Sequence, residues 1–165
     1  MKNWKGENHF VGIGDHYGKD IFGGILVAGI ILALSSIFPA IGTIGIPDVQ
    51  ALSGDAVSQF LIVVVAAAII EEIFFRGILL SLLDDKLGWN FFISAVLTSV
   101  AFALYHYAAY GGNLVAAGGN FITAGIAGMI FAYTRKYFDS LTPAIILHAV
   151  LNFVIARELF GLVIG

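Results

Sequence analysis

Five long apolar stretches constrain the fold of this chain more than any other feature. Each approaches the roughly 20 mostly apolar residues that a helix needs to cross a bilayer. The chain is 59% hydrophobic and 12% charged, whereas about a quarter of the residues in a soluble domain are charged. We therefore predict an all-α fold, a polytopic transmembrane bundle of about five helices. The expected spans are residues 21–38, about 60–83, about 89–110, about 120–137 and about 143–162.

The basic residues outside these stretches predict how the chain is oriented. Residues 1–20 form a polar tail with three lysines, and we interpret this tail as cytoplasmic or interfacial and residues 21–165 as one helical domain. Lys86 follows the second stretch, and Arg135 and Lys136 end the fourth, while the two remaining loops hold no lysine or arginine. The positive-inside bias then predicts a multi-pass cell-membrane protein with its N-terminus in the cytoplasm and its C-terminus outside.

Composition excludes several classes of partner and site. The eight basic residues form no patch and the net charge is −3, so we expect no nucleic-acid partner. The chain has no cysteine, which excludes a disulfide scaffold, a thiol nucleophile and a cysteine-ligated metal. His9 and His16 in the tail can be metal ligands or solvated side chains, and we favour solvation. The expected partner from composition is the lipid bilayer, and the oligomeric state is open.

Three ionisable residues lie in the middle of the second apolar stretch. An ionisable group near the bilayer centre costs at least about 2.5 kcal/mol on insertion scales, so Glu71, Glu72 and Arg76 need an explanation. Glu72 and Arg76 are four residues apart, in the order that favours an ion pair on a helix. Glu71 points about 100° away from Glu72 and lacks that partner. A purely structural cluster explains Glu72 and Arg76 well and Glu71 poorly.

Two further stretches carry polar residues at helical spacing. Phe102 and His106 are four apart in the third stretch, so the phenyl ring can pack beside the imidazole. His148 and Asn152 are four apart in the fifth. Each pair alone is most simply a satisfied core group or an interhelical hydrogen bond. Because three helices each carry groups that lipid excludes, we expect these groups to converge on one internal cavity.

Such a cavity would contain the functional groups needed for acyl-transfer hydrolysis with water as the nucleophile. Glu71 can take a proton from water, because a carboxylate without a countercharge in a low-dielectric site is a good proton acceptor. His106 can position or polarise that water, and His148 and Asn152 can donate hydrogen bonds to a developing oxyanion. We find no credible serine nucleophile, since Ser81, Ser94 and Ser99 lie in apolar runs without a histidine at helical spacing. A proton-coupled transporter would also bury such groups, but the chain shows no internal repeat.

Small residues and one proline indicate how the helices pack and begin. Ala124 and Gly128 are four apart, a spacing that lets two helix backbones approach closely, although such pairs also arise by chance. Thr142 precedes Pro143, which predicts that Thr142 is the N-cap of the last helix. Counting residues by helical rise places His106 higher in the bilayer than Glu71. A shared site therefore requires a tilted or later-starting third helix.

Three short runs resemble one enzyme family when they are taken together and in order. They are Glu71-Glu72-Ile73-Phe74-Phe75-Arg76, Phe102-Ala103-Leu104-Tyr105-His106 and His148-Ala149-Val150-Leu151-Asn152. This pattern is similar to the three motifs of the CAAX prenyl protease and bacteriocin-processing family, which includes the type II prenyl endopeptidases. The likeness extends over roughly residues 61–153.

The resemblance implies a membrane-embedded endopeptidase that cleaves near the C-terminus of lipidated or membrane-bound peptides. It implies that Glu71 is the carboxylate that activates water and that His106 assists. It implies that His148 and Asn152 form the oxyanion site. Glu72, Arg76 and Phe102 would support these groups. We expect no cofactor; zinc held by Glu71, His106 and His148 is the less favoured alternative. The alternative to an enzyme is a membrane immunity or binding protein that keeps the motifs as a structural cluster.

Overall fold

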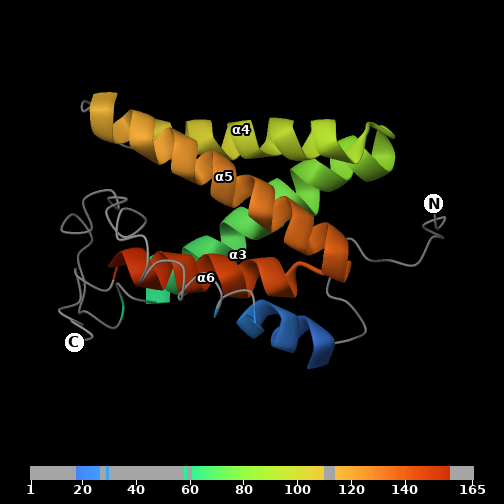
Figure 1. Cartoon of the computed structure of the whole chain (residues 1–165), viewed down its shortest axis with the longest axis horizontal. Helices are drawn as coiled ribbons and strands as arrows, with labels where there is room; N and C mark the ends of the chain where they lie inside the picture. The colour runs from blue at the N-terminus through green and yellow to red at the C-terminus, as the bar shows by residue number, and fades with distance from the viewer. Residues whose placement is uncertain (1–17, 27–28, 30–57, 59–60, 110–113, 157–165) are drawn as a thin grey trace.

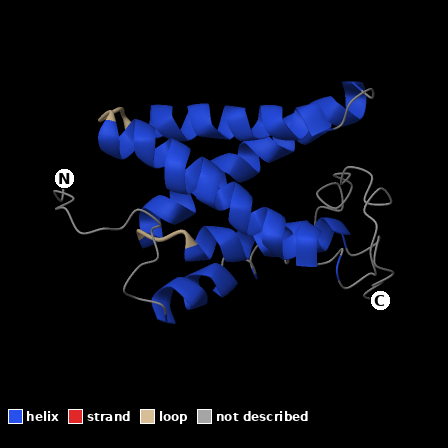
Figure 2. Ribbon diagram, turned by 180° about the vertical axis from the view of Figure 1, so that it is seen from behind, coloured by secondary structure: helices blue, strands red, loops and turns tan. Residues whose placement is uncertain are grey.

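The structure is a computed structural model that describes residues 18–26, 29, 58, 61–109 and 114–156. All regular secondary structure in these ranges is helical (Figure 2). Residues 18–26 form one helix, and a second helix runs without a break from residue 61 to residue 86. Three more follow: α4 (Phe91–Ala109), α5 (Leu114–Phe138) and α6 (Thr142–Ala156). The predicted all-α class is confirmed.

The helix over residues 61–86 alternates between α-type and wider π-type turns. Its segments are η3 (Leu61–Ala66), α3 (Ala67–Glu72), η4 (Ile73–Leu80) and η5 (Leu82–Lys86). Glu71 and Glu72 end the α-type segment, and Arg76 lies in the π-type segment that follows. π-type turns are uncommon inside helices and occur frequently at functional sites. The two acidic residues of the first motif therefore lie at a change in helical winding.

Several helix boundaries differ from those expected. The first helix already includes residues 18–20, and α5 begins at Leu114 rather than near residue 120. Residues 114–117 are Leu, Val, Ala and Ala, of which Leu and Ala are strong helix formers, and the two glycines after them do not break the helix. α6 is described as far as Ala156. The expected continuation to residue 162, and most of the first span beyond residue 26, lie outside the described residues.

A glycine turn joins the 61–86 helix to α4. Gly88 has a φ of 67°, in the left-handed region where glycine carries no steric penalty. The backbone amide of Trp89 donates to the carbonyl of Leu83 at 3.0 Å, which closes the end of the helix. The side chain of Asn90 then accepts a hydrogen bond from the amide of Phe92 at 2.9 Å and caps the start of α4.

The start of α6 differs from the prediction that Thr142 is its N-cap. Asp139 adopts a positive φ of 52° directly after α5. The carbonyl of Leu141 accepts the amide of Ile145 at 2.9 Å, so α6 already includes Thr142. The hydroxyl of Ser140 accepts the amide of Thr142 at 3.2 Å. Ser140, rather than Thr142, therefore supplies the side chain at this helix start.

The described helices pack around two apolar clusters, and the larger one, which we call the core, lies beside the motif residues. In Figure 1 α4 lies at the top, antiparallel to α5, and α6 lies below them. The 61–86 helix runs diagonally through the middle, from α6 to the start of α4. The helix of residues 18–26 lies against the end of α5 and the start of α6, where a β-carbon at Gly23 would meet the ring of Phe138. The core consists of side chains from η4, α4, α5 and α6: Phe75, Phe102, Ala127, Phe131, Ala144 and Leu147.

The small-residue spacing on α5 marks a close helix contact. A β-carbon added at Gly128 would lie 3.0 Å from the β-carbon of Ser99 on α4, whereas one at Gly125 would meet the Ala103 side chain at an ordinary 3.8 Å. Ala124 packs against the core. The predicted packing role of Gly128 is therefore confirmed, and Gly128 is the point where the two backbones approach most tightly among the described glycines of α5.

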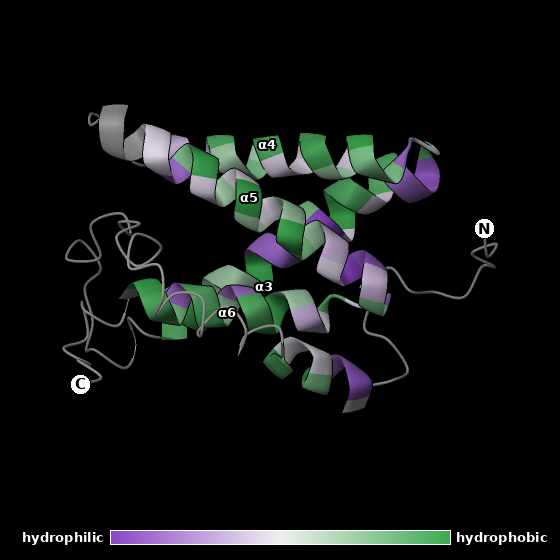
Figure 3. Ribbon diagram, viewed as in Figure 1, coloured by the Kyte–Doolittle hydropathy of each residue, from purple (hydrophilic) through white to green (hydrophobic). Residues whose placement is uncertain are grey.

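Hydropathy is distributed unevenly over this bundle. Figure 3 shows hydrophilic residues on α3, in the middle of the molecule, among helices that are otherwise largely hydrophobic. Of the helices that the structure describes, none combines the length and apolar character needed to cross a membrane. The transmembrane part of the fold prediction stays a prediction.

Candidate active site

The three motifs meet in one cluster, although they come from three separate helices. The Oε2 atom of Glu71 lies 3.6 Å from Nε2 of His148 and 3.7 Å from Nε2 of His106. These distances are within ion-pair range and slightly longer than a direct hydrogen bond. Glu71 Oε2 is buried and has no hydrogen-bond partner among the described residues. The expected juxtaposition of Glu71, His106 and His148 is therefore present, and His106 is not displaced from Glu71.

The second carboxylate of the first motif is held on two sides. Glu72 Oε1 accepts a hydrogen bond from Nη1 of Arg76 at 2.8 Å and another from Nδ1 of His148 at 2.8 Å. The side chains of Glu72 and Arg76 are both fully buried. The ion pair predicted from their spacing is confirmed. Glu72 also reaches across to α6, a contact that the spacing of the residues does not reveal.

Arg76 ties this carboxylate to the rest of the bundle. Its Nη2 atom donates to the carbonyl of Gly128 on α5 at 3.2 Å. The guanidinium lies over the ring of Phe102, 4.4 Å from the centroid, and 5.1 Å from that of Phe131. Cation–π contacts of this kind stabilise a desolvated guanidinium. Arg76 therefore links the 61–86 helix, α4 and α5 beside the site.

Hydrogen-bond partners assign the protons on both imidazole rings. Nδ1 of His106 lies 2.9 Å from the carbonyl oxygen of Phe102, which can only accept, so this nitrogen carries a hydrogen. Nδ1 of His148 faces a carboxylate oxygen of Glu72, and by the same reasoning it donates. Each neutral ring then has a lone pair at Nε2, the atom directed at Glu71.

Aromatic rings fix the orientation of the two imidazoles. The ring of Phe102 packs against His106 with centroids 4.3 Å apart, as its spacing predicted, and also contacts His148 at 5.6 Å. Phe131 on α5 stacks on His148 with centroids 4.8 Å apart and an interplanar angle of 19°. Phe131 and the Gly128 carbonyl were not identified from the sequence. Both lie on α5, which carries none of the three motifs, so only the packing of α5 brings them to the site.

The remaining predicted site residue, Asn152, lies on α6, and the predicted zinc alternative can be compared with the arrangement of the described side chains. Asn152 follows His148 by one turn of α6 and is half-buried. Within the ranges that the structure describes, no group of three or more histidine and acidic side chains is arranged to hold a metal ion. The proposed zinc ligands Glu71, His106 and His148 are nevertheless the residues that converge.

A second charged cluster lies at the end of the 61–86 helix and joins it to the end of α5. We call it the helix-end cluster and call the first one the motif cluster. In the helix-end cluster Lys136 Nζ lies 2.7 Å from Asp84 Oδ2. Arg135 Nη2 donates to the Ser81 hydroxyl at 2.7 Å and lies 3.8 Å from Asp85 Oδ2. The helix-end cluster consists of Ser81, Asp84, Asp85, Arg135 and Lys136, and the motif cluster of Glu71, Glu72, Arg76, His106 and His148.

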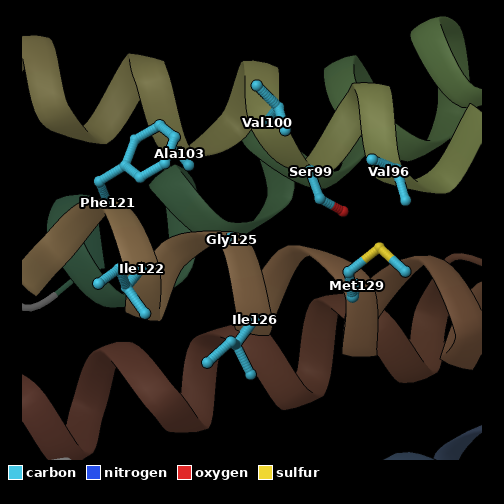
Figure 4. A pocket seen from close by; sticks show the side chains of 9 residues that line it. All are labelled: Val96, Ser99, Val100, Ala103, Phe121, Ile122, Gly125, Ile126 and Met129. Carbon is cyan, nitrogen blue, oxygen red and sulfur yellow. The ribbon is translucent and has the colours of Figure 1, made fainter.

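An apolar hollow of about 270 Å³ lies between α4 and α5 (Figure 4). Among the residues that line it, Ser99 is the only one with a side-chain polar atom, and its hydroxyl is buried without a hydrogen-bond partner among the described residues. The hollow contains no residue of the motif cluster. Its lining consists of Val96, Ser99, Val100, Ala103, Phe121, Ile122, Gly125, Ile126 and Met129.

Comparison with known proteins agrees with the geometry of the motif cluster. The family model described as "Type II CAAX prenyl endopeptidase Rce1-like" matches residues 53–154, which is more than half of the chain and includes all three motifs. Comparison with curated proteins and with solved structures finds no significant match. The chain therefore belongs to the Rce1-like family of type II CAAX prenyl endopeptidases.

Proposed function

We propose that this protein is a membrane-embedded endopeptidase that uses a glutamate-activated water to cleave near the C-terminus of lipidated or membrane-bound peptides. The family assignment supports a peptide hydrolase. The observation that carries the mechanism is the position of Glu71: its buried Oε2 faces the Nε2 atoms of both histidines, and no lysine or arginine of the described residues lies within ion-pair distance of it. A purely structural carboxylate would have a permanent countercharge, as Glu72 has in Arg76.

Glu71 is the general base in this mechanism. A water molecule between Glu71 and His106 loses a proton to the carboxylate as its oxygen attacks the scissile carbonyl carbon. The lone pair on His106 Nε2 accepts the water's other hydrogen and orients the attacking oxygen. Asn152 supplies an amide donor to the oxyanion that forms.

The hydrogen bonds of the described hydroxyl groups favour a water nucleophile over a side-chain nucleophile. The hydroxyl of Ser94 donates to the backbone carbonyl of Asn90, and that of Thr98 donates to the carbonyl of Ser94. Ser81 is engaged with Arg135 in the helix-end cluster. The hydroxyls of Ser81, Ser94 and Thr98 are thus engaged with groups other than a histidine, the base that would activate a hydroxyl nucleophile.

Apolar side chains on the outer faces of the helices support placement in a membrane. Large hydrophobic residues are strongly exposed, including Phe22 at 68%, Ile70 at 66% and Ile122 at 64%, and they occur on every described helix except α6. Exposed apolar surface of this kind favours contact with lipid or with a partner over contact with water. Members of the Rce1-like family are membrane proteins. A cytoplasmic N-terminus remains the orientation that the lysine and arginine distribution favours.

Peptide cleavage by the detergent-purified protein tests this function. The substrates are a farnesylated CAAX peptide and its unlipidated form, each incubated with and without a zinc chelator. We expect release of the C-terminal residues from the farnesylated peptide at a rate that the chelator does not change. Loss of cleavage on chelation would contradict the glutamate mechanism in favour of zinc. Absence of cleavage of either peptide by folded protein would contradict the protease and favour the immunity or binding function.

A further inference from the structure

Side chains typical of a membrane–water interface gather at the end of the bundle that carries the helix-end cluster. Trp89 and Tyr133 are about half exposed there, and Tyr137 is 84% exposed. The ring of Phe91 contacts that of Tyr133 at 5.1 Å and lies 5.0 Å from Nζ of Lys136, so these side chains share one end. Tryptophan and tyrosine are enriched at the headgroup level of a bilayer, and lysine extends its amine toward that level. We call Trp89, Tyr133, Lys136 and Tyr137 the interfacial belt.

Beyond the interfacial belt, the outward faces of α4 and α5 carry large aliphatic side chains. The exposed ones include Ile93, Leu97, Val100, Ile122, Ile126 and Ile130. α4 begins and α5 ends at the belt, so both helices lead from it to the hollow of Figure 4. At 1.5 Å per residue, Val96 lies about 8 Å into α4, and Met129 lies about 6 Å before Tyr133. In a bilayer, the hollow therefore lies at the depth where the acyl chains begin.

The hollow opens outward and has a floor of small residues. Ser99 and Ala103 are buried in this floor, and a β-carbon added at Gly125 would meet the Ala103 side chain at an ordinary 3.8 Å. Ile122 and Ile126 line the hollow and are more than half exposed, so they form part of its rim. Small residues in the floor and bulky residues on the rim make a groove between the two helices.

The lining of the hollow fits a hydrocarbon chain better than other occupants. Its one polar side-chain atom, the Ser99 hydroxyl, is itself buried. Ordered water needs about three polar partners, and a peptide backbone would leave its amides unpaired here. A cavity of about 150 Å³ holds benzene, so about 270 Å³ is enough for a segment of one acyl chain. A helix is about 10 Å wide, so a second copy of the chain can insert only single side chains.

We propose that the α4–α5 hollow binds one acyl chain of a bilayer phospholipid whose headgroup lies at the interfacial belt. The two helix ends at the belt carry three acidic and three basic side chains: Asp84, Asp85, Asp139, Lys86, Arg135 and Lys136. This balance complements a zwitterionic headgroup such as phosphocholine better than an anionic one. The inference rests on the membrane placement in the proposed function and not on peptide hydrolysis. The hollow contains no residue of the motif cluster, so this lipid is distinct from the substrate.

The depth of the interfacial belt is measured by fluorescence. The chain has two tryptophans, so Trp4→Phe leaves Trp89 as the only one. The variant is reconstituted in phosphatidylcholine vesicles with lipids brominated either near the glycerol end or near the methyl end of the acyl chain. We expect the shallow bromines to quench Trp89 more strongly, because a belt tryptophan lies at the headgroup level. Stronger quenching by the deep bromines, or quenching by neither, would overturn the proposal.

Filling the hollow tests the site itself. Gly125→Leu places a branched side chain where the acyl chain would lie. Gly119→Leu is the matched control, since it adds the same side chain to the same helix at a position where a β-carbon would have no neighbour within 4 Å. Binding of dioleoyl phosphatidylcholine to each delipidated protein in detergent is titrated by native mass spectrometry. We expect Gly125→Leu to weaken binding by at least about 10-fold, as when roughly two methylene groups are no longer buried, and Gly119→Leu to bind like wild type.

Gly125→Ala keeps the test valid if Gly125→Leu does not fold. Its β-carbon makes only an ordinary contact, so this variant should keep the helical content of wild type and weaken lipid binding by a smaller factor. Equal lipid binding by wild type and the folded Gly125 variants would overturn the proposal.

Three other outcomes would assign the hollow to a different occupant and so overturn the proposal. Tighter binding of phosphatidylglycerol than of phosphatidylcholine would indicate an anionic headgroup. A dimer that the Gly125 variants dissociate would indicate a second copy of the chain. Displacement of the lipid by the farnesylated peptide would indicate the isoprenoid of the substrate. None of these measurements needs catalysis, so if neither peptide is cleaved the proposed function fails while the lipid result stands.

Discussion

The motif cluster and the helix-end cluster use the same types of side chain but satisfy them differently. In the helix-end cluster each acid faces a lysine or arginine, and solvent reaches part of it, since the Lys136 side chain is 50% exposed. In the motif cluster Glu72 pairs with Arg76 and both side chains are fully buried, while the ion-pair partners of Glu71 among the described residues are two histidines. One cluster therefore balances its charges near the surface, and the other leaves a carboxylate unbalanced inside.

This difference shows which buried charged residues can be explained by their contribution to stability. A partly exposed ion pair forms at little cost and contributes little. A buried carboxylate without a cation is unfavourable, and side chains of this kind occur mainly where their proton affinity is used. Glu72 and Arg76 are accounted for by their mutual pairing. Glu71 is accounted for by the chemistry that we propose.

The largest expected effect on stability comes from removing the cation of the motif cluster. Arg76→Met leaves Glu72 buried without its cation and removes the contact to the Gly128 carbonyl. We expect the free energy of unfolding to fall by about 3–5 kcal/mol, measured by denaturant titration in detergent with circular dichroism. The double variant Glu72→Gln, Arg76→Met removes both charges and should recover much of this loss. If Arg76→Met lowers the free energy of unfolding by less than about 1 kcal/mol, the Glu72–Arg76 pair contributes no more than an exposed ion pair, which would contradict this prediction.

The close approach of α4 and α5 beside the motif cluster gives the next effect. A β-carbon at Gly128 would lie 3.1 Å from the backbone Cα of Ser99, which cannot move aside without shifting α4. We expect Gly128→Ala to destabilise by about 1–3 kcal/mol in the same titration. Gly125→Ala is the control on the same helix, because its β-carbon would make only an ordinary contact. If both variants unfold alike, the close contact is not as tight as described.

The smallest effect is expected from the matched substitution in the helix-end cluster. Lys136→Met removes a cation, as Arg76→Met does, but from a half-exposed side chain 2.7 Å from Asp84. We expect a change of about 0–1 kcal/mol that shrinks further at high salt. A loss as large as that of Arg76→Met would mean that the two clusters do not differ in the way described.

Sequence patterns predicted the parts of this structure that depend on spacing along one helix. The Glu72–Arg76 pair and the contact of Phe102 with His106 both follow from residues four apart. Convergence of three motifs was predicted because buried polar groups need partners. These arguments require only helical geometry and the exclusion of polar groups from an apolar interior.

Contacts between different helices could not be predicted from residue spacing along one helix. The hydrogen bond of Glu72 to His148 joins residues 76 apart and depends on how α3 and α6 are placed. The stacking of Phe131 on His148 depends in the same way on α5. The start of α5 at Leu114 was missed because two glycines obscured a helical stretch. Depth counted from straight helices also placed His106 too far from Glu71, which it contacts at 3.7 Å.

The most direct test of the central claim compares one carboxylate from each cluster. Glu71→Gln and Asp85→Asn each replace an acid by its neutral amide, and both proteins are assayed on the farnesylated peptide at matched helical content. We expect Glu71→Gln to lower the cleavage rate by at least about 100-fold, because the general base is lost, and Asp85→Asn to cleave like wild type. Cleavage by Glu71→Gln at the wild-type rate would contradict the account.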